Sequence, residues 1–469
     1  EIETVSGTDI DYVELEYSGS TFVAGEPIEC DISAYDQNGN LVAADSTTRL
    51  IPVSEMAGMY FSPDTVTLSG GLASFAAFDA VAGQNRISIE SLSGEVLFPF
   101  DQYINIIPAA AYQITELSGD TTGVISGDTV ELRARVMDRY GNTIEDEVVR
   151  FSITSNLGGS PSLIDATGDP LDGLVLSDAG GAARCSLITD TNTGLNTVEA
   201  SILDGDPPDR ETVEFTVQSS AGNISRYEIS VDQLIQEAGA GFDAEIVGID
   251  LNGNIAFGDD TTRVVPGSSG SAVFSSDTLT LTDGSATVTV IDSIAERFTL
   301  SAETAGGGAL SYSDTITIMP GEPAGSIDIF SVVPDTITAN GLSRSAITTE
   351  PVRDSFGNVV TEGTQVTVTP SAGTVTSDDF NQVIPGVQRE TGGSGRVSVF
   401  VNSGNTPSDV LVDFQSVEGT ALGQAQLVFA PPPDCRYANF IEPRFIVPGG
   451  NEQFRCRVAN LSATGLYIG

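Results

Sequence analysis

The chain repeats itself with a period of about 215 residues, and this repetition limits the possible folds more than any other feature. The segment YDQNGNLVAADSTTR at 35–49 returns without a gap as IDLNGNIAFGDDTTR at 249–263, a spacing of 250 − 36 = 214 residues. A second pair interleaves with the first: VMDRYGN at 136–142 and VRDSFGN at 352–358 are 354 − 138 = 216 residues apart. The order is A-B-A-B, and each unit has roughly 100 residues, the size of one immunoglobulin-type sandwich.

Apolar and polar residues alternate along one segment in each of the first three units. The apolar positions are Ile28, Cys30, Ile32 and Ala34 in the first unit, Val130, Leu132, Ala134 and Val136 in the second, and Phe242, Ala244 and Ile246 in the third. A period of two predicts strands with one buried face and one wet face, as in antiparallel sandwiches. The fourth unit alternates poorly at Thr348, Glu350 and Val352, so its register is the least defined.

We predict an all-β protein of tandem immunoglobulin-like antiparallel β-sandwich domains in an elongated rod. Short, Pro-containing linkers separate the units and favour a semi-rigid chain. The predicted domains are 1–108 (A-type), 109–218 (B-type), 223–319 (A-type), 320–430 (B-type) and 431–469, which holds the first strands of a further A-type unit. Strands of seven to ten residues give roughly 35–40 Å per unit, or on the order of 150 Å for four units.

The net charge of −46 comes from missing cations: all 19 basic residues are Arg, and the chain has no Lys, His or Trp. Such a polyanion repels nucleic acid and anionic membrane surfaces. No stretch approaches the length of a membrane span, so we expect neither nucleic acid as a partner nor direct membrane insertion. A saline habitat and a genome rich in Arg codons both account for this composition.

The same missing residues exclude several kinds of catalysis. Without His there is no Ser-His or Cys-His pair and no His-ligated metal, and without Lys there is no Schiff base or P-loop. Paired carboxylates could hydrolyse glycosides, but sugar sites use aromatic platforms, and this chain has only 7% aromatic residues. We therefore predict that the protein is not an enzyme and binds no cofactor.

Two A-type turns resemble calcium loops superficially. Their oxygen-bearing side chains are Asp36, Asn38 and Asn40 in the first and Asp250, Asn252 and Asn254 in the second. The pattern lacks the distal Glu of an EF-hand, and Asn-Gly after a strand is a strong turn signal, so we interpret both as plain turns. The neighbouring pair Asp259 and Asp260 offers a further place for a divalent cation, with ordinary solvated loop acids as the alternative.

The four cysteines fall into two groups. Cys30 and Cys185 lie on inward faces of different units, so we predict buried free thiols. Cys435 and Cys456 are close in sequence within the last partial unit, where antiparallel strands would bring them together. We predict a disulfide between Cys435 and Cys456, which suits an oxidising compartment.

Several recurring motifs resemble bacterial Ig-like domains of the invasin and intimin type. A Pro-Ala linker leads to an Ile-containing first strand, and a later alternating strand ends in Asp-x-x-Gly-Asn. These motifs lie at Pro108–Ile114 and Pro323–Ile327, at Asp138–Asn142 and Asp354–Asn358, and in the turn and strand Ser177–Leu187. The resemblance covers units two and four best and implies a spacer, either a stiff stalk of an adhesin or a subunit of a surface fibre.

We therefore expect a non-enzymatic structural protein located outside the cell, at the cell surface. Its partners would be copies of itself or other surface-fibre subunits. Strands from a neighbouring subunit, or from chain downstream of residue 469, would complete the unit at 431–469. One alternative is a binding module that recognises a host or cell-surface ligand through loops at one sandwich end. Another is an accessory region of a glycan-active enzyme.

Overall fold

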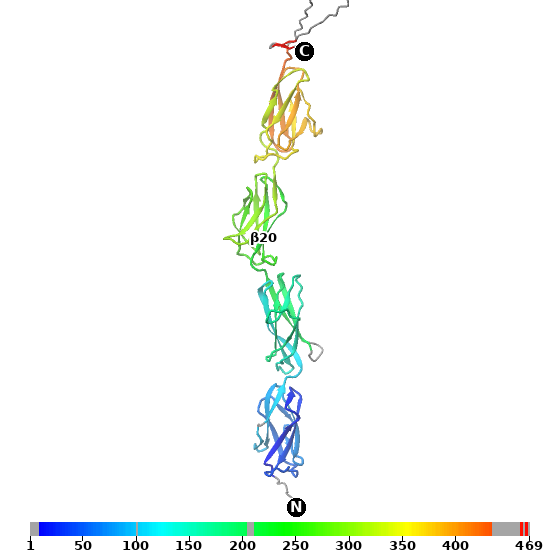
Figure 1. Ribbon diagram of the computed structural model, residues 1–469, viewed down its shortest axis with the longest axis vertical. Helices are drawn as coiled ribbons and strands as arrows, with labels where there is room; N and C mark the ends of the chain where they lie inside the picture. Colours follow the sequence, from blue (N-terminus) through cyan, green and yellow to red (C-terminus); the bar gives the residue numbers. More distant parts are fainter. Residues whose placement is uncertain (1–8, 100–101, 204–210, 434–459, 463–464, 468–469) are drawn as a thin grey trace, which may run out of the picture. The chain divides into compact units, whose positions relative to one another are not determined.

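The computed structural model describes residues 9–99, 102–203, 211–433, 460–462 and 465–467, and it contains strands and no helix there (Figure 1). No segment in these ranges is a helix that could span a membrane. The chain divides into two compact units, Glu1–Asn223 with Ile249–Phe257, and Ile224–Gly248 with Gly258–Gly469. Each compact unit contains two β-sandwiches. The short loop Ile249–Phe257 follows a strand of the third sandwich but groups with the first compact unit.

The first sandwich has two facing sheets. One sheet has the strand order β1 (Tyr12–Tyr17), β3 (Pro27–Tyr35), β7 (Leu72–Phe78) and β5 (Tyr60–Ser62). The other has the order β2 (Thr21–Val23), β10 (Tyr103–Ile107), β8 (Gly83–Ser91), β4 (Arg49–Ser54) and β6 (Val66–Thr67), with β9 (Val96–Phe98) paired to β8.

The second sandwich repeats this order. Its first sheet contains β11 (Ala111–Ser118), β13 (Thr129–Asp138), β17 (Ala182–Ile188) and β15 (Ser162–Ile164). Its second sheet contains β12 (Thr121–Ile125), β19 (Thr212–Ser220), β18 (Gly194–Ile202), β14 (Val148–Ile153) and β16 (Leu174–Leu176).

The third sandwich has the same first sheet but a divided second layer. The first sheet contains β20 (Arg226–Val231), β22 (Gly241–Ile249), β26 (Ser285–Ile291) and β24 (Val273–Phe274). The second layer consists of β21 (Ile235–Glu237), β30 (Ile316–Met319) and β27 (Arg297–Phe298), and of β25 (Leu279–Thr280), β23 (Arg263–Ser268), β28 (Leu300–Thr304) and β29 (Leu310–Tyr312).

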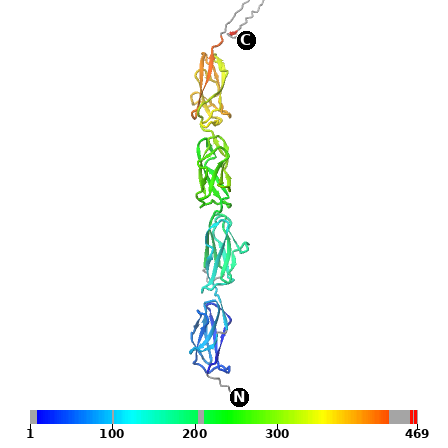
Figure 2. The ribbon, with the colours of Figure 1, turned by 90° about the vertical axis from the view of Figure 1, so that its left-hand side faces the viewer.

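The fourth sandwich again has two continuous sheets. They are β31 (Ile329–Val333), β33 (Arg344–Thr349), β37 (Ser398–Asn402) and β35 (Thr374–Val375), and β32 (Thr336–Thr338), β39 (Leu422–Ala430), β38 (Ser408–Ser416), β34 (Gln365–Pro370) and β36 (Val387–Glu390). Two views of the chain show the strands of each sandwich as two layers (Figures 1 and 2).

All four sandwiches share the strand order of an immunoglobulin-type fold. The chain enters one sheet, crosses to the other through a short strand, and pairs that strand in parallel with the last strand of the sandwich, as β2 does with β10. Most other pairings are antiparallel. The predicted fold class, tandem Ig-like antiparallel β-sandwiches, is confirmed. The rod shape and the domain bounds stay predictions.

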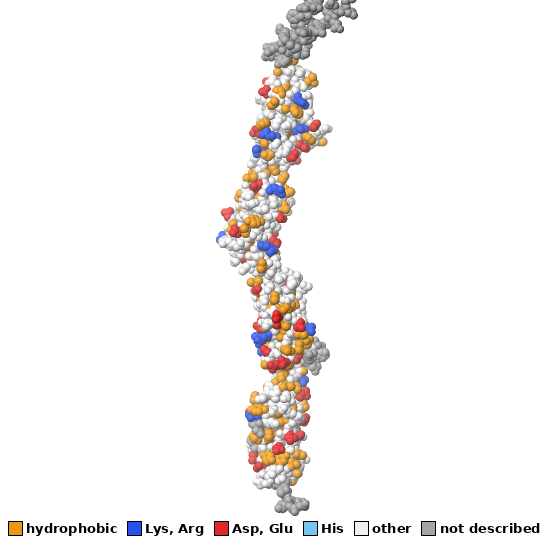
Figure 3. Space-filling model, in the orientation of Figure 1, with side chains coloured by type: hydrophobic (Ala, Val, Ile, Leu, Met, Phe, Trp, Pro, Cys, Tyr) orange, Lys and Arg blue, Asp and Glu red, His pale blue; other side chains and the backbone are white. Residues whose placement is uncertain are grey.

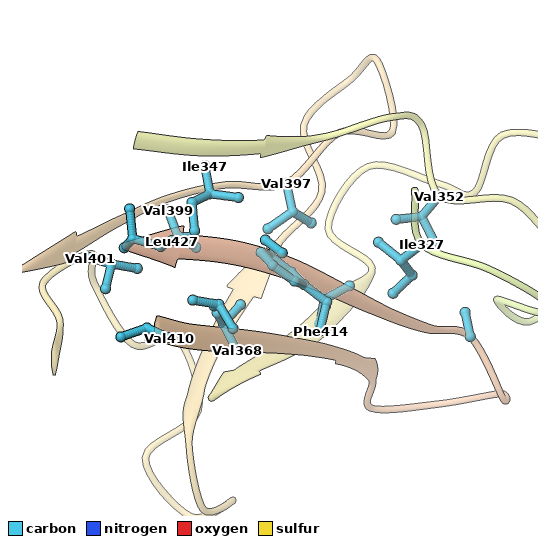
Figure 4. Close-up of a cluster of buried hydrophobic side chains, with 14 of the residues drawn as sticks. Ile327, Ile347, Val352, Val368, Val397, Val399, Val401, Val410, Phe414 and Leu427 are labelled. Atoms are coloured by element: carbon cyan, nitrogen blue, oxygen red, sulfur yellow. The ribbon is translucent and has the colours of Figure 1, made fainter. Parts of the chain in front are cut away.

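Each sandwich encloses its own cluster of buried apolar side chains. In the fourth, Val368, Val410, Phe414 and Leu427 from one sheet meet Ile347, Val399 and Val401 from the other, all at most 1% exposed (Figure 4). Burying side chains of this size contributes about 1.5–3 kcal/mol each. The strands predicted from alternation in the first three units are β3, β13 and β22, whose apolar residues face these clusters.

The irregular alternation in the fourth unit has a structural cause. Strand β33 buries Ser345, Ile347 and Thr349 and then ends, and the next buried residues are Val352 and Asp354. The inward face therefore shifts by one residue after Thr349. Pro351 lies inside this shift, and proline has no N–H to continue a strand ladder.

Strands β40 (Asn460–Ser462) and β41 (Gly465–Tyr467) form an antiparallel pair. Most of the predicted partial unit at 431–469, including Cys435 and Cys456, lies outside the described residues. On the face drawn in Figure 3, charged side chains lie singly or in small groups among uncharged ones.

Candidate functional site

The Asp-x-x-Gly-Asn turn at the end of one core strand recurs in every sandwich. Its first residue is Asp36, Asp138, Asp250 or Asp354, and all four side chains are at most 4% exposed. Each turn begins beside the first strand of its own sandwich, because the preceding strand pairs with that strand. A buried carboxylate requires hydrogen-bond donors, and these turns provide them.

The carboxylate organises its own turn. Asp36 Oδ1 accepts hydrogen bonds from the backbone N–H of Asn38 at 2.9 Å and of Asn40 at 3.0 Å. Asp250 Oδ1 accepts the equivalent bonds from Asn252 and Asn254, both at 2.8 Å. The Asn side chain closes the ring, since Asn254 Nδ2 donates to Asp250 Oδ2 at 3.0 Å. The structure therefore has the geometry of the plain turns predicted from the sequence.

Hydrogen bonding also sets the ionisation of these acids. Burial opposes the charged form of Asp250, but bonds from the Asn254 side chain and from the backbone N–H of Gly222, Asn254 and Asn252 outweigh burial and lower its pKa. For Asp354, too, burial is the largest influence, and bonds led by the Asn358 side chain reverse it and lower the pKa. Both carboxylates are therefore held as anions inside the turn.

The carboxylates among the calcium candidates accept hydrogen bonds from N–H and O–H donors. Asp259 Oδ1 accepts from the backbone N–H of Thr261 and Thr262, and Asp260 Oδ1 accepts from the backbone N–H of Asp283 at 2.9 Å. Within the described ranges, no three His, Cys, Asp or Glu side chains come together in a way that could hold a metal ion. The structure assembles Asp36 with Asn40 and Asp250 with Asn254 as hydrogen-bonded pairs, and the interpretation of these residues as turn residues and not calcium ligands stays a prediction.

The turn of the second sandwich also reaches the first sandwich. Asn142 Nδ2 donates to Ala80 O at 2.8 Å, and the backbone N–H of Ala82 donates to Asn142 Oδ1 at 2.9 Å. The carboxylate of the same turn holds the linker, because Asp138 Oδ2 accepts from the backbone N–H of Ala109 at 2.9 Å. One turn thus fixes its own loop, the linker and the neighbouring sandwich.

The fourth sandwich makes the same contact with the third. Asn358 Nδ2 donates to Ser293 O at 2.8 Å, and the backbone N–H of Ala295 donates to Asn358 Oδ1 at 2.9 Å. Asp354 Oδ2 accepts from the backbone N–H of Gly321 in the linker at 2.9 Å. The agreement between two separate pairs of sandwiches shows that the contact is built by the motif.

The loop Ile249–Phe257 makes an equivalent set of hydrogen bonds with the second sandwich, which belongs to the same compact unit. Asn254 Nδ2 donates to Thr191 O at 2.8 Å, and the backbone N–H of Thr193 donates to Asn254 Oδ1 at 3.1 Å. Asp250 Oδ2 accepts from the backbone N–H of Gly222 at 3.0 Å. The last Asn of each of the three later turns (Asn142, Asn254 and Asn358) therefore binds one backbone carbonyl and one backbone N–H that lie two residues apart.

These targets sit on a loop that a second buried acid shapes. The loops begin at Asp79, Asp190 and Asp292, each at most 3% exposed. Each carboxylate accepts from the backbone N–H two residues later, at 2.8–3.0 Å. The loop thus presents its following carbonyl and N–H outward in a fixed geometry, and we call it the receiving loop.

The third position of the turn separates A-type from B-type contacts. In the B-type turns an aromatic ring lies there, and Tyr140 packs against Gly25 while Phe356 packs against Gly239 so closely that neither glycine has room for a Cβ. In the A-type loop Ile249–Phe257, Asn252 Nδ2 instead donates to Ser126 O at 2.8 Å. The turn therefore carries a second contact whose chemistry differs between the two repeat types.

The sequence did not reveal the part played by Asn142 and Asn358 or by the receiving loops. The A-type repeats did carry a signal. The segments Asp79-Ala-Val-Ala82 and Asp292-Ser-Ile-Ala295 each follow the third strand of the first sheet, β7 in one sandwich and β26 in the other. A strand-end Asp that recurs at one place predicts a buried cap.

The two described cysteines are free and buried, as predicted. Burial, with a smaller contribution from the carboxylates of Glu29 and Asp31, raises the pKa of Cys30 to about 12. Burial alone raises the pKa of Cys185 to about 12. Both thiols are core residues of their sandwiches.

Comparison with known proteins finds bacterial adhesins. No family model matches the chain. It is 26% identical over 375 residues to the inverse autotransporter adhesin YeeJ of Escherichia coli K12, a match that covers 76% of this chain and 15% of YeeJ. The chain thus spans about 15% of the length of that curated relative.

Solved structures of similar fold include bacterial surface proteins. FdeC, an Escherichia coli adhesin, is 17% identical, with 68% of this chain and 100% of that chain covered and a TM-score of 0.42. Invasin, a bacterial integrin-binding protein, is 16% identical, with 89% and 79% covered and a TM-score of 0.38. The resemblance to invasin- and intimin-type proteins predicted from the sequence is confirmed.

Proposed function

We propose that this chain is a non-enzymatic, cell-surface segment of a bacterial adhesin-type protein, and that it serves as a spacer. The observation that carries the proposal is the recurrence of one docking contact. The Asn side chains of three turns bind a receiving loop through the same pair of hydrogen bonds. The curated relative is an adhesin, which supports a location outside the cell.

A docked turn suits a spacer because it restricts the angle between sandwiches. A linker alone would leave two domains free to move, as is the default for small interfaces. Here the Asp carboxylate ties the linker to the turn, and the Asn carboxamide ties the turn to the receiving loop. Both restraints act on residues at one end of the sandwich and leave its flanks exposed.

The test is small-angle X-ray scattering of the whole chain and of the double variant Asn142→Ala, Asn358→Ala. We expect an extended particle, on the order of 150 Å long from four units of about 35–40 Å, and a smaller radius of gyration with a broader distance distribution in the variant. Asn40→Ala is the matched control, because Asn40 occupies the same position in its turn but binds only Asp36 among the described residues. A compact wild-type particle, or equal scattering from the double variant, would refute the spacer.

Assembly into a fibre is a finer proposal within the same function. We propose that copies of the chain, or other fibre subunits, add strands to the unit at 431–469, since strand addition joins subunits through backbone hydrogen bonds. Deletion of 431–469 should then abolish polymers and surface display. Undiminished polymer and display in the deletion variant would leave a single-chain stalk.

One loop of the fourth sandwich favours a second candidate, a binding module. Between β35 and β36 the chain exposes Phe380 by 51% and Val383 by 91%. Exposed apolar residues on a loop are a common feature of binding surfaces. If this loop binds a cell-surface ligand, Phe380→Ser with Val383→Ser should reduce cell binding while the scattering profile stays that of the wild type.

A further inference from the structure

The turn Asp36–Asn40 has the same internal structure as the docked turn at 250–254. In both, the backbone N–H of the Asp donates to the carbonyl of the last Asn, at 3.0 Å in the first turn and 2.9 Å in the other. The Gly N–H donates back to the Asp carbonyl in each. The two sequences, DQNGN and DLNGN, differ only at Gln37 and Leu251, and Leu251 is 86% exposed.

The side chains of Asn38 and Asn40 in the first turn have atoms that could make further hydrogen bonds. Asn40 Nδ2 donates to the two carboxylate oxygens of Asp36 at 3.3 and 3.4 Å, longer than the 3.0 Å of the bond from Asn254 to Asp250. In the ranges that the structure describes, no donor reaches Asn40 Oδ1, and the Asn38 side chain has no hydrogen bond. These are the atoms that Asn254 and Asn252 use for docking.

The residue at the third position of the turn indicates which type of sandwich such a turn fits. We call the contacted surface the receiving end: it consists of the receiving loop and of the residues that the third position contacts, such as Ser126 and Gly127. Asn252 Nδ2 donates to Ser126 O, and Asn254 Nδ2 donates to Ser126 Oγ at 3.0 Å. These acceptors belong to a B-type sandwich. The A-type ends present Ala24-Gly25 and Ala238-Gly239 instead, and there an aromatic ring fills the place of the carboxamide.

We propose that the turn Asp36–Asn40 is a docking site for the receiving end of a B-type Ig-like sandwich placed ahead of β1. Asn40 takes a carbonyl and an N–H of the receiving loop, as Asn254 takes those of Thr191 and Thr193. Asn38 takes the carbonyl of the residue that corresponds to Ser126. The proposal rests on the proposed role of the turns as junctions, but it concerns a turn that the double variant Asn142→Ala, Asn358→Ala leaves unchanged.

The test uses two lengthened chains. One carries a copy of the B-type segment 109–223 directly before Ile10, in place of residues 1–9, and the other carries a copy of the A-type segment 9–110 there. One conservative substitution outside the turns marks the inserted copy by mass. Hydrogen–deuterium exchange then reports the receiving-loop amide, Thr193 in the B-type copy and Ala82 in the A-type copy.

We expect Asn40→Ala, and separately Asn38→Ala, to speed exchange at Thr193 of the B-type copy by about tenfold, as the loss of one or two net hydrogen bonds would. Asn38→Ala should have a smaller effect on Ala82 of the A-type copy, because Ala24 offers a carbonyl but no hydroxyl, whereas Asn252 Nδ2 also lies 3.4 Å from Ser126 Oγ. No effect of Asn40→Ala on the B-type copy would overturn the docking site. Equal effects of Asn38→Ala on both copies would overturn the preference for a B-type end.

A second variant decides the question even if an inserted copy fails to fold, which loss of protection in its core strands would show. Leu251→Gln in the chain itself turns the docked DLNGN turn into the DQNGN of the first sandwich. We expect exchange at Thr193 to stay at the wild-type rate. An increase of about tenfold or more, equivalent to the loss of the bonds to Asn254, would show that DQNGN does not fit a B-type end.

Discussion

Gly25→Ala should separate the first two sandwiches without unfolding either one. Gly25 has φ = +81°, and a Cβ added there would overlap the ring of Tyr140, with Tyr140 Cε2 only 2.6 Å away. Alanine in this left-handed conformation costs about 1–2 kcal/mol for the backbone alone. The ring must also leave its contact to make room for the methyl group.

The second cost follows from the burial of the ring. Tyr140 is 40% exposed when docked, and full burial of a large side chain contributes about 1.5–3 kcal/mol, so expelling the ring costs about 1–2 kcal/mol. That range corresponds to a 5- to 30-fold increase in the population of the open junction. The bond between the N–H of Ala82 and Asn142 Oδ1 breaks in the open state.

Hydrogen–deuterium exchange at Ala82 measures this opening, and Gly127→Ala is the matched control. Gly127 has φ = +88° and carries the same backbone strain, but its added Cβ would meet Asn252 Nδ2 at 3.5 Å, an ordinary contact. Exchange at Ala82 should therefore accelerate 5- to 30-fold in Gly25→Ala, while Gly127→Ala leaves the contact between Gly127 and Asn252 in place. Unchanged exchange at Ala82 in Gly25→Ala would refute the reasoning.

Three further predictions concern ionisable groups. Because hydrogen bonds lower the pKa of Asp354, its stabilisation of the turn is present above the unfolded pKa of about 3.9 and is lost as the pH falls through the folded value, which exchange of turn amides at pH 3 and 6 would show. Burial and the nearby carboxylate of Glu296 raise the pKa of Asp292, so its stabilisation is lost as the pH rises. Asp292→Asn should therefore raise the melting temperature at pH 7, whereas Asp79→Asn, whose two carboxylate oxygens both accept N–H bonds, should lower it. Cys30, with a pKa of about 12, should react with a thiol reagent at pH 8 only after unfolding, as peptide mapping would reveal.

Strands could be predicted from the sequence wherever the inward residues alternate without interruption. In β3 the sequence of Ile28, Cys30 and Ile32 needs only the two-residue period of a strand to define the buried face. In the fourth sandwich the same argument fails between Thr349 and Val352. Proline at 351 ends the ladder there, and the inward face resumes one residue out of step.

The turns could be predicted as turns, but their partners could not. Asp138 and Asn142 stand out in the sequence because their side chains carry the pattern. The atoms that Asn142 binds are the carbonyl of Ala80 and the N–H of Ala82, which every residue except proline possesses. A contact with backbone atoms leaves almost no trace in the identity of the residue contacted, so only the structure reveals it.

The alternation of A-type and B-type repeats follows from the chemistry of these contacts. Tyr140 of a B-type turn packs its ring against Gly25, whereas Asn252 of an A-type turn donates to the carbonyl of Ser126. An aromatic ring placed over Ser126, which is 3% exposed, would replace Asn252 and deprive the Ser126 carbonyl of its hydrogen bond from Asn252 Nδ2. A buried polar group left without a partner costs about 1–3 kcal/mol. A carboxamide placed over an Ala-Gly end would find a carbonyl there but would lose the hydroxyl that Ser126 places 3.4 Å from Asn252 Nδ2. Both mismatched pairings of turn and contacted residue are thus weaker than the two observed ones, and a difference of this size favours the observed match between turn type and contacted end.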